Sequence, residues 1–139
     1  MELITDRKEA DVLLGSDKGS YSCADLNRVE QAVLTLAQTA QRLDLWYAPQ
    51  VKLDWKAPGK FDPAQWPGQS QMKRYLKNVQ VLCGLVGVES RLPASMEKLT
   101  WNGANQIEKA LLAVERQIFE IINTFGYSGE IFAGEETGI

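Results

Sequence analysis

The fold of this chain is decided by residues 104–125, which read ANQIEKALLAVERQIFEIINTF. Apolar residues recur there in alternating steps of three and four, at Ala104, Ile107, Leu111, Val114, Ile118, Ile121 and Phe125. This spacing averages 3.5 residues and draws one narrow apolar stripe along a helix. Because Thr100 precedes the stripe and can act as an N-cap, we predict a helix over residues 100–125, roughly 35 Å long.

Two earlier segments repeat the alternation and predict two more long helices, over residues 22–46 and 70–86. The first begins with Ser22 and Asp25, which are spaced as in a capping box, and its apolar stripe consists of Leu26, Val29, Val33, Leu36, Ala40 and Leu43. Its opposite face, with Arg28, Glu30 and Gln31, is polar. The second stripe consists of Met72, Leu76, Val79, Cys83 and Val86, and Gly84 and Gly87 weaken the helix at its end.

Three apolar stripes have to bury one another, and helices with this period pack at shallow angles of about 20°. We therefore predict a mainly α protein, a three-helix bundle forming one domain over residues 1–126. A shorter helix from about Asp6 to Leu14, stopped by Gly15, is expected to lie against the bundle. A chain of 139 residues is long enough to bury one such core.

A long connection, residues 46–69, joins the first two long helices and contains four of the five prolines. Its residues 51–56 alternate apolar and polar side chains, which predicts a half-buried extended segment. We expect its aromatic residues to cap the open end of the bundle; the alternative is an exposed aromatic platform that binds a partner. These candidate residues are Trp46, Tyr47, Trp55, Phe61 and Trp66.

The last segment, residues 127–139, changes pattern and repeats the order aromatic, small, Gly, Glu at a spacing of five. It is too short and too rich in glycine to fold alone, yet it carries apolar side chains. We predict an extended tail that binds a partner, because an extended segment can add to a sheet edge or lie in a groove. The candidate binding residues are Tyr127, Glu130, Ile131, Phe132 and Glu135.

The residue types that carry most enzyme chemistry are missing or unarranged. The chain has no histidine, which excludes Ser-His and Cys-His nucleophile systems and zinc sites with His ligands. Cys23 and Cys83 lie far apart in the sequence, and we expect both to be free, buried thiols. The candidate carboxylates for acid–base work are expected on solvent faces, at Glu97, Glu108, Glu115 and Glu120. We predict no catalytic site, no metal and no cofactor.

The charges are unevenly distributed. Residues 50–80 carry six bases and two acids, whereas residues 127–139 carry three acids and no base. This asymmetry is typical of a solvated surface, and it would also allow neighbouring copies to touch head to tail.

Basic residues near Trp55 and Trp66 leave single-stranded nucleic-acid binding as an alternative, but a pI near 5.0 argues against it. A carbohydrate-binding module with Trp55 and Trp66 as platforms is the other alternative.

The N-terminal residues lack the basic start and apolar stretch of a secretory signal, and no apolar run approaches the ~20 residues of a membrane span. We therefore expect synthesis in the cytoplasm and no association with a membrane.

A set of short stretches occurs in one order over nearly the whole chain: residues 4–7, 10–12, 21–22, 25–30, 32–33, 54–55, 74–76, 78–79, 93–99, 107–109 and 127–130, with Met72 and Asn105. In these stretches the chain resembles small virion proteins found near tail-fibre and baseplate genes in phages and prophages of Gram-positive bacteria. The resemblance implies a non-enzymatic structural role in a phage tail, baseplate or related contractile particle. Its implied partners are other virion proteins and copies of itself, and its implied location is the tail region of the virion.

Overall fold

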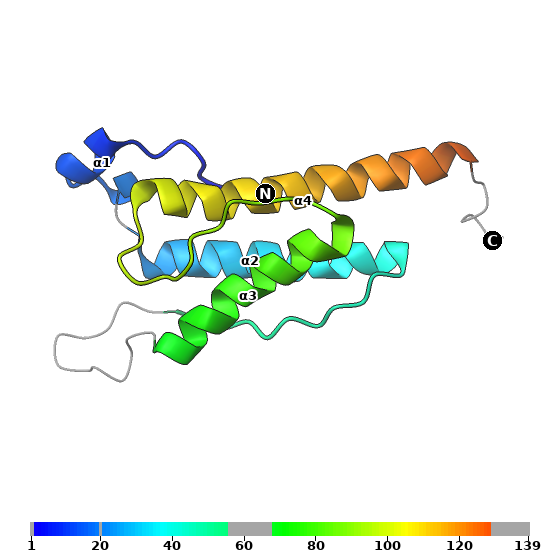
Figure 1. Ribbon diagram of the computed structural model, residues 1–139, viewed down its shortest axis with the longest axis horizontal. Helices are drawn as coiled ribbons and strands as arrows, with labels where there is room; N and C mark the ends of the chain where they lie inside the picture. The colour runs from blue at the N-terminus through cyan, green and yellow to red at the C-terminus, as the bar shows by residue number, and fades with distance from the viewer. Residues whose placement is uncertain (1, 20, 56–67, 129–139) are drawn as a thin grey trace.

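The computed structural model describes residues 2–19, 21–55 and 68–128 (Figure 1). Over these residues the chain is mainly helical and contains no β-strand. The four α-helices are α1 (Glu9–Leu13), α2 (Cys23–Ala40), α3 (Gln69–Val86) and α4 (Trp101–Ser128). Two short 3-10 helices, η1 (Asp17–Gly19) and η2 (Gln41–Leu43), complete the elements. The mainly helical class predicted from the apolar periodicity is confirmed.

The starts of two long helices follow from their first side chains. The predicted capping box of α2 is present: the backbone N–H of Ser22 donates to Asp25 Oδ2 at 2.7 Å, and the Ser22 side chain accepts the reciprocal bond. At the start of α4, the backbone N–H of Gly103 donates to Thr100 Oγ1 at 3.0 Å. Both bonds satisfy backbone N–H groups that have no partner within the first helical turn.

The ends of the helices depend on left-handed backbone positions. Gly87 ends α3 with φ 73°, and the N–H of Val88 donates to the carbonyl of Cys83 at 2.8 Å. Gly15 has φ 65° just after α1. The prediction that the first long helix continues to Trp46 is wrong, because α2 ends at Ala40 and Asp44 turns the chain after η2 with φ 59°.

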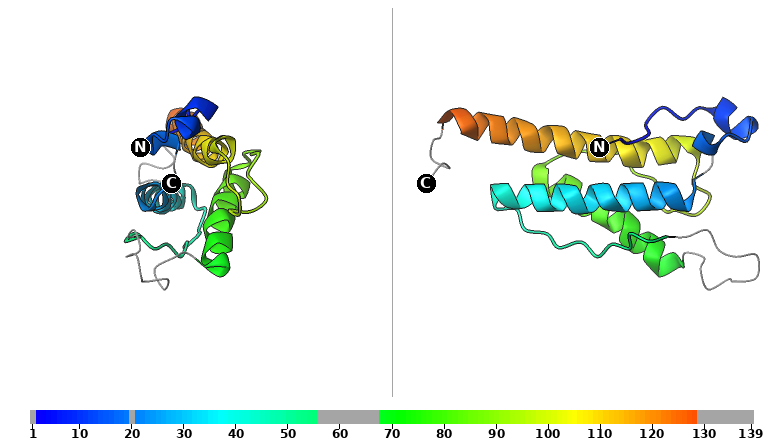
Figure 2. Two further views of the ribbon diagram at one scale, coloured as in Figure 1. Left: turned by 90° about the vertical axis from the view of Figure 1, so that its left-hand side faces the viewer. Right: turned by 180° about the vertical axis from the view of Figure 1, so that it is seen from behind.

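The three long helices share one core and run in the same direction (Figures 1 and 2). α4 runs alongside α2, and α3 crosses them obliquely. Residues 44–55 and 87–100 return the chain, so that each long helix starts at the same end of the molecule. The buried side chains at the centre of this core are Val29, Val33, Tyr75, Val79, Leu82, Ile107, Leu111, Val114 and Ile118.

The N-terminal segment runs along α4 before α1 begins. The backbone N–H groups of Ile4 and Arg7 donate to Glu108 and Asn105, which fixes residues 4–7 antiparallel to α4. As a result α1 lies beyond the start of α4 (Figure 1) and has no buried residue. The prediction that this helix lies against the bundle is therefore wrong.

Candidate functional site

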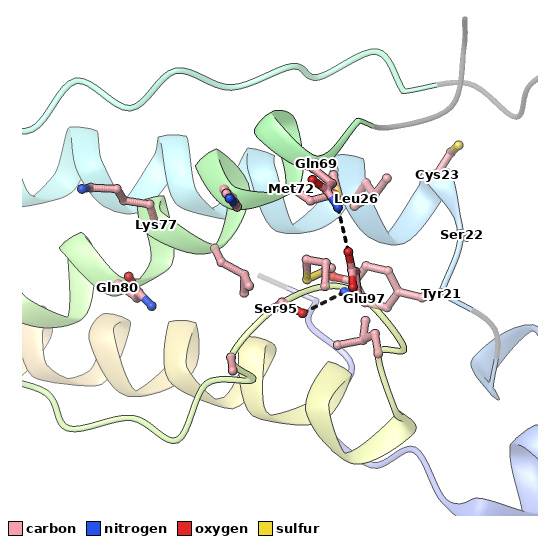
Figure 3. A pocket seen from close by; sticks show the side chains of 15 residues that line it. Tyr21, Ser22, Cys23, Leu26, Gln69, Met72, Lys77, Gln80, Ser95 and Glu97 are labelled. Carbon is pink, nitrogen blue, oxygen red and sulfur yellow. Dashed lines mark hydrogen bonds between the residues drawn. The ribbon is translucent and has the colours of Figure 1, made fainter. Parts of the chain in front are cut away.

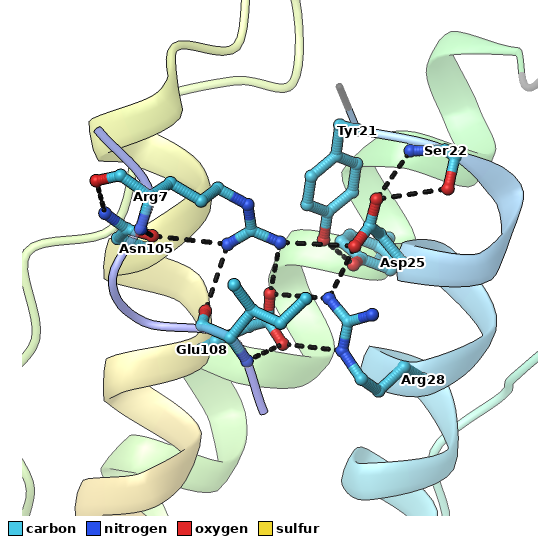
Figure 4. A network of polar contacts seen from close by, with 9 residues as sticks. Arg7, Tyr21, Ser22, Asp25, Arg28, Asn105 and Glu108 are labelled. Atoms are coloured by element: carbon cyan, nitrogen blue, oxygen red, sulfur yellow. Dashed lines mark hydrogen bonds and ion pairs between the residues drawn. The ribbon is translucent and has the colours of Figure 1, made fainter. Parts of the chain in front are cut away.

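Charged and polar side chains gather where the N-terminal segment, α2 and α4 meet (Figure 4), and all of them except Arg28 are buried. We call this group the buried ion network; it consists of Arg7, Asp25, Arg28, Asn105 and Glu108. Glu108 is at its centre with 0% of its surface exposed. Buried charges of this kind are tolerated only when they are paired and hydrogen-bonded.

The two guanidinium groups of the buried ion network share the two carboxylates. Arg7 Nη2 contacts Glu108 Oε2 at 2.6 Å and Asp25 Oδ1 at 3.2 Å. Arg28 donates through Nε to Glu108 Oε1 at 2.9 Å and through Nη2 to Asp25 Oδ1 at 2.5 Å. Burial alone would lower the pKa of Arg28, but the hydrogen bonds to Glu108 and Asp25 outweigh it, so the pKa lies above its ordinary value.

Asn105 completes the network by binding the backbone of the N-terminal segment. Its side-chain amide donates to the carbonyl of Arg7 at 2.9 Å, and its Oδ1 accepts the Arg7 N–H at 3.0 Å. All four carboxylate oxygens of Asp25 and Glu108 accept hydrogen bonds from the chain itself. The arrangement therefore stabilises the contact between three segments of the chain.

The prediction that Glu108 lies on a solvent face is wrong. The apolar stripe of α4 gives the helix a buried face but does not reveal what covers the neighbouring positions. Here the N-terminal segment lies over Glu108, and its arginine makes the burial of a carboxylate possible. One signal was present: Asn105 and Glu108 are three residues apart and share a face of the helix, and both fall in the stretches that carry the resemblance.

A second polar group holds the connection against α2 and α3. Glu30, expected on the polar face of the first long helix, is buried with 1% exposure. Its Oε2 accepts from Trp55 Nε1 at 2.7 Å and from the N–H of Lys52 at 2.8 Å, and its Oε1 pairs with Arg74 at 2.6 Å. Asn27 adds two hydrogen bonds to the backbone of Trp55, at 2.8 and 2.9 Å.

The candidate aromatic residues of the connection have different surroundings. Trp55 is buried, with 5% exposure, whereas Trp46 is 70% exposed. Tyr47 is half-buried and donates to Asn78 Oδ1 at 2.5 Å. Phe61 and Trp66 lie outside the described residues.

The predicted tail falls largely outside the described residues. Tyr127 belongs to the last turn of α4, so the helix continues two residues past the predicted boundary at residue 126. The candidates Glu130, Ile131, Phe132 and Glu135 lie outside the described residues.

A hollow in the described surface lies between α2, α3 and residues 94–99 (Figure 3). We call it the α3 groove; its volume is about 1110 Å³. Its walls are mostly apolar, and Lys73 and Lys77 add positive charge. Gln69 Nε2 donates to Glu97 Oε1 at 2.8 Å across its rim. The apolar lining residues are Tyr21, Leu26, Met72, Leu76, Ala94, Met96 and Leu99.

Tyr21 separates the groove from the buried ion network. The guanidinium carbon of Arg7 lies 5.5 Å from the centre of the Tyr21 ring, and the Tyr21 hydroxyl is hydrogen-bonded to that of Tyr75. Burial raises the pKa of both phenols well above the ordinary value of about 10. The two hydroxyls therefore stay protonated over the physiological range.

Both cysteines are free, as expected, but only Cys83 is fully buried. Burial raises the pKa of the Cys83 thiol, which makes it a poor nucleophile. Cys23 is half-buried at the start of α2.

Exposed apolar side chains gather on and just after α1. Leu13 is 78% exposed and Leu14 82%, next to Val12 at 47%. The sequence did not single out these residues, because the short helix from about Asp6 to Leu14 was expected to lie against the bundle. Of the helices that the structure describes, none is both long and apolar enough to cross a membrane.

Within the described ranges, no cluster of carboxylates and thiols is arranged to hold a metal ion. Comparisons with protein-family models, with curated proteins and with solved structures find no match to this chain.

Proposed function

We propose that this chain is a non-enzymatic structural protein of a phage tail, baseplate or related contractile particle, and that it docks onto neighbouring subunits. The observation that carries the proposal is the apolar surface at the end of α1, where Leu13 is 78% exposed and Leu14, just after the helix, is 82% exposed. A contiguous group of exposed apolar side chains, here Val12, Leu13 and Leu14, is a candidate surface for another protein to cover.

The helical body supports an assembly role. We interpret α2, α3 and α4 as a three-helix bundle whose connections are locked by buried ion pairs. α1 and the C-terminal end of α4 lie at opposite ends of the long axis (Figure 1). A body with docking elements at both ends is suited to link neighbours.

The resemblance to small virion proteins supplies the proposed setting. The stretches that carry it contain Arg7, Asp25, Arg28, Asn105 and Glu108, so they coincide with the buried ion network. Chains that share these residues would share the way in which the N-terminal segment is fastened to the helices. The proposed partners are other virion proteins and copies of the same chain.

The two alternative functions lose support from the positions of their key residues. A carbohydrate platform at Trp55 needs an open indole face, but this ring is 5% exposed. Single-stranded nucleic-acid binding near Trp55 is less favoured because two of the basic side chains there are already paired: Arg74 with Glu30, and Lys52, which lies 3.7 Å from Asp54.

Incorporation into particles tests the proposal. The double variant Leu13→Ser with Leu14→Ser should keep the helical content and melting temperature of the parent, because both side chains are already exposed. Its amount in purified particles, measured by quantitative mass spectrometry, should fall more than tenfold. Phe119→Ser is the matched control, since it removes a half-exposed apolar side chain from the outer face of α4.

Two results would contradict the proposal. If the parent chain is missing from particles purified from cells that make it, the proposed setting is wrong. If the double variant is incorporated as well as the parent, α1 is not a docking element.

A further inference from the structure

We infer that the α3 groove binds the C-terminal tail, residues 129–139, of a second copy of this chain. The inference rests on the proposed function in treating the chain as an assembly subunit, and it deepens it by naming the partner of the tail. Three observations carry it: the apolar walls of the groove, its two lysines, and the distance between the groove and the end of α4.

The chemistry of the groove matches that of the tail. Residues 129–139 read GEIFAGEETGI, with adjacent Ile131 and Phe132, three acids and no base. The groove offers an apolar wall at Leu26, Met72 and Met96, with Lys73 and Lys77 exposed beside it. Apolar anchors with charged partners at the rim are the usual composition of a peptide-binding groove.

The position of the groove excludes the tail of the same chain as the source of these anchors. Leu99 and Met96 line the groove just before α4 begins, whereas the tail starts after Ser128 at its other end. The 28 residues of α4 span roughly 40 Å at 1.5 Å per residue. Phe132 is four residues beyond Ser128 and reaches at most about 14 Å from it.

A contact between the groove of one copy and the tail of another is heterologous, because different surfaces meet. Such contacts produce closed rings or open chains of subunits, according to the rotation between neighbours. Every copy carries both the acidic tail and the basic segment around α3. The same contact can therefore repeat from one copy to the next.

The experiment measures self-association of the full-length chain by sedimentation velocity over a range of concentration and salt. The parent should form oligomers, and higher salt should weaken them because exposed charges are screened. The groove variant Lys73→Glu with Lys77→Glu, and the tail variant Phe132→Asp, should each lower the association constant at least tenfold. Lys109→Glu changes an exposed lysine on α4 and should leave association unchanged.

Mixing the two defective variants distinguishes this contact from other modes of association. The tail variant retains an intact groove and the groove variant an intact tail, so one productive contact is possible between them. An equimolar mixture should therefore form a 1:1 dimer and nothing larger, although each variant alone is monomeric. Circular dichroism of each variant confirms that the fold is retained, which the exposure of both lysines favours.

Several results would overturn the inference. One is a parent that remains monomeric at about 100 µM and low salt, as expected if residues 56–67 of the same chain cover the groove. Another is oligomers that persist unchanged in both variants, or a mixture that does not dimerise. If the parent enters particles normally but does not self-associate, this inference fails while the proposed function stands. If the parent self-associates but is missing from particles, the proposed function fails while this inference stands.

Discussion

The buried ion network and the α3 groove both contact Tyr21, and they reverse the usual distribution of side chains. The network pairs two arginines with two carboxylates; Arg7, Asp25 and Glu108 are buried, and the Arg28 side chain is 23% exposed. The groove leaves methionine and leucine side chains along an open surface. In the network, charge pairing fastens segments of one chain together, whereas the apolar wall of the groove is the surface on which we propose that a second copy docks.

The largest expected effect comes from breaking the network at Glu108. Glu108→Gln removes the charge that both Arg7 and Arg28 contact, and leaves two guanidinium groups facing a neutral amide. Loss of one partner of a buried ion pair costs about 3–5 kcal/mol, a large part of the ~5–15 kcal/mol that stabilises a typical domain. Urea unfolding followed by circular dichroism measures the change.

The control for this prediction is Glu120→Gln on the exposed side of the same helix. It should change the free energy of unfolding by less than about 0.5 kcal/mol. Equal stability of the two variants would show that the network contributes nothing beyond ordinary surface charge.

A smaller effect is expected for the tryptophans of the connection. Trp55→Phe keeps most of the buried ring but removes the N–H that donates to Glu30. Leaving a buried acceptor with one partner fewer should destabilise the fold by about 1–3 kcal/mol. Trp46→Phe, at a position 70% exposed, should stay within about 0.5 kcal/mol of the parent. Thermal unfolding of the two variants tests this; a larger loss for Trp46→Phe would refute it.

Removal of the α4 cap should have an effect of about 1 kcal/mol. Thr100→Ala deletes the oxygen that accepts the N–H of Gly103. Thr100→Ser keeps this oxygen and should remain close to the parent in urea unfolding. If both variants lose the same stability, the methyl group of Thr100 matters and the cap does not.

The smallest effect at neutral pH is expected from the tyrosine pair. The pKa of Tyr21 and of Tyr75 is raised in the folded state, so the native chain holds these protons more tightly than the unfolded chain does. Their contribution to stability is complete below about pH 10, the unfolded pKa, and is lost as the pH rises towards the folded values.

Tyr75→Phe tests this pH dependence. The free energy of unfolding of the parent should fall with pH above about 10, and the variant should show a shallower fall. Tyrosinate absorbance at 295 nm, recorded with circular dichroism, should show part of the tyrosine signal appearing only as helicity is lost. Ionisation of every tyrosine near pH 10 in the folded protein would contradict the prediction.

The amino-acid sequence by itself determined where the long helices lie and how two of them begin. The alternating steps of three and four marked α3 and α4 to within a few residues, and Ser22, Asp25 and Thr100 marked the caps. These features depend on side chains a few residues apart, so a local pattern contains the information. The overextended end of α2 shows the limit, because a left-handed Asp44 leaves little trace in the periodicity.

Only the tertiary structure decided that the long helices point the same way, that α1 projects, and that Glu30 and Glu108 are buried. Each of these depends on contacts between distant segments; Arg7 and Glu108, for example, are 101 residues apart. A carboxylate on a helix can be buried only when a positively charged side chain, such as an arginine from a distant segment, pairs with it; otherwise it stays in solvent. Periodicity predicts which face of a helix is apolar, and the folded chain decides what covers the remainder.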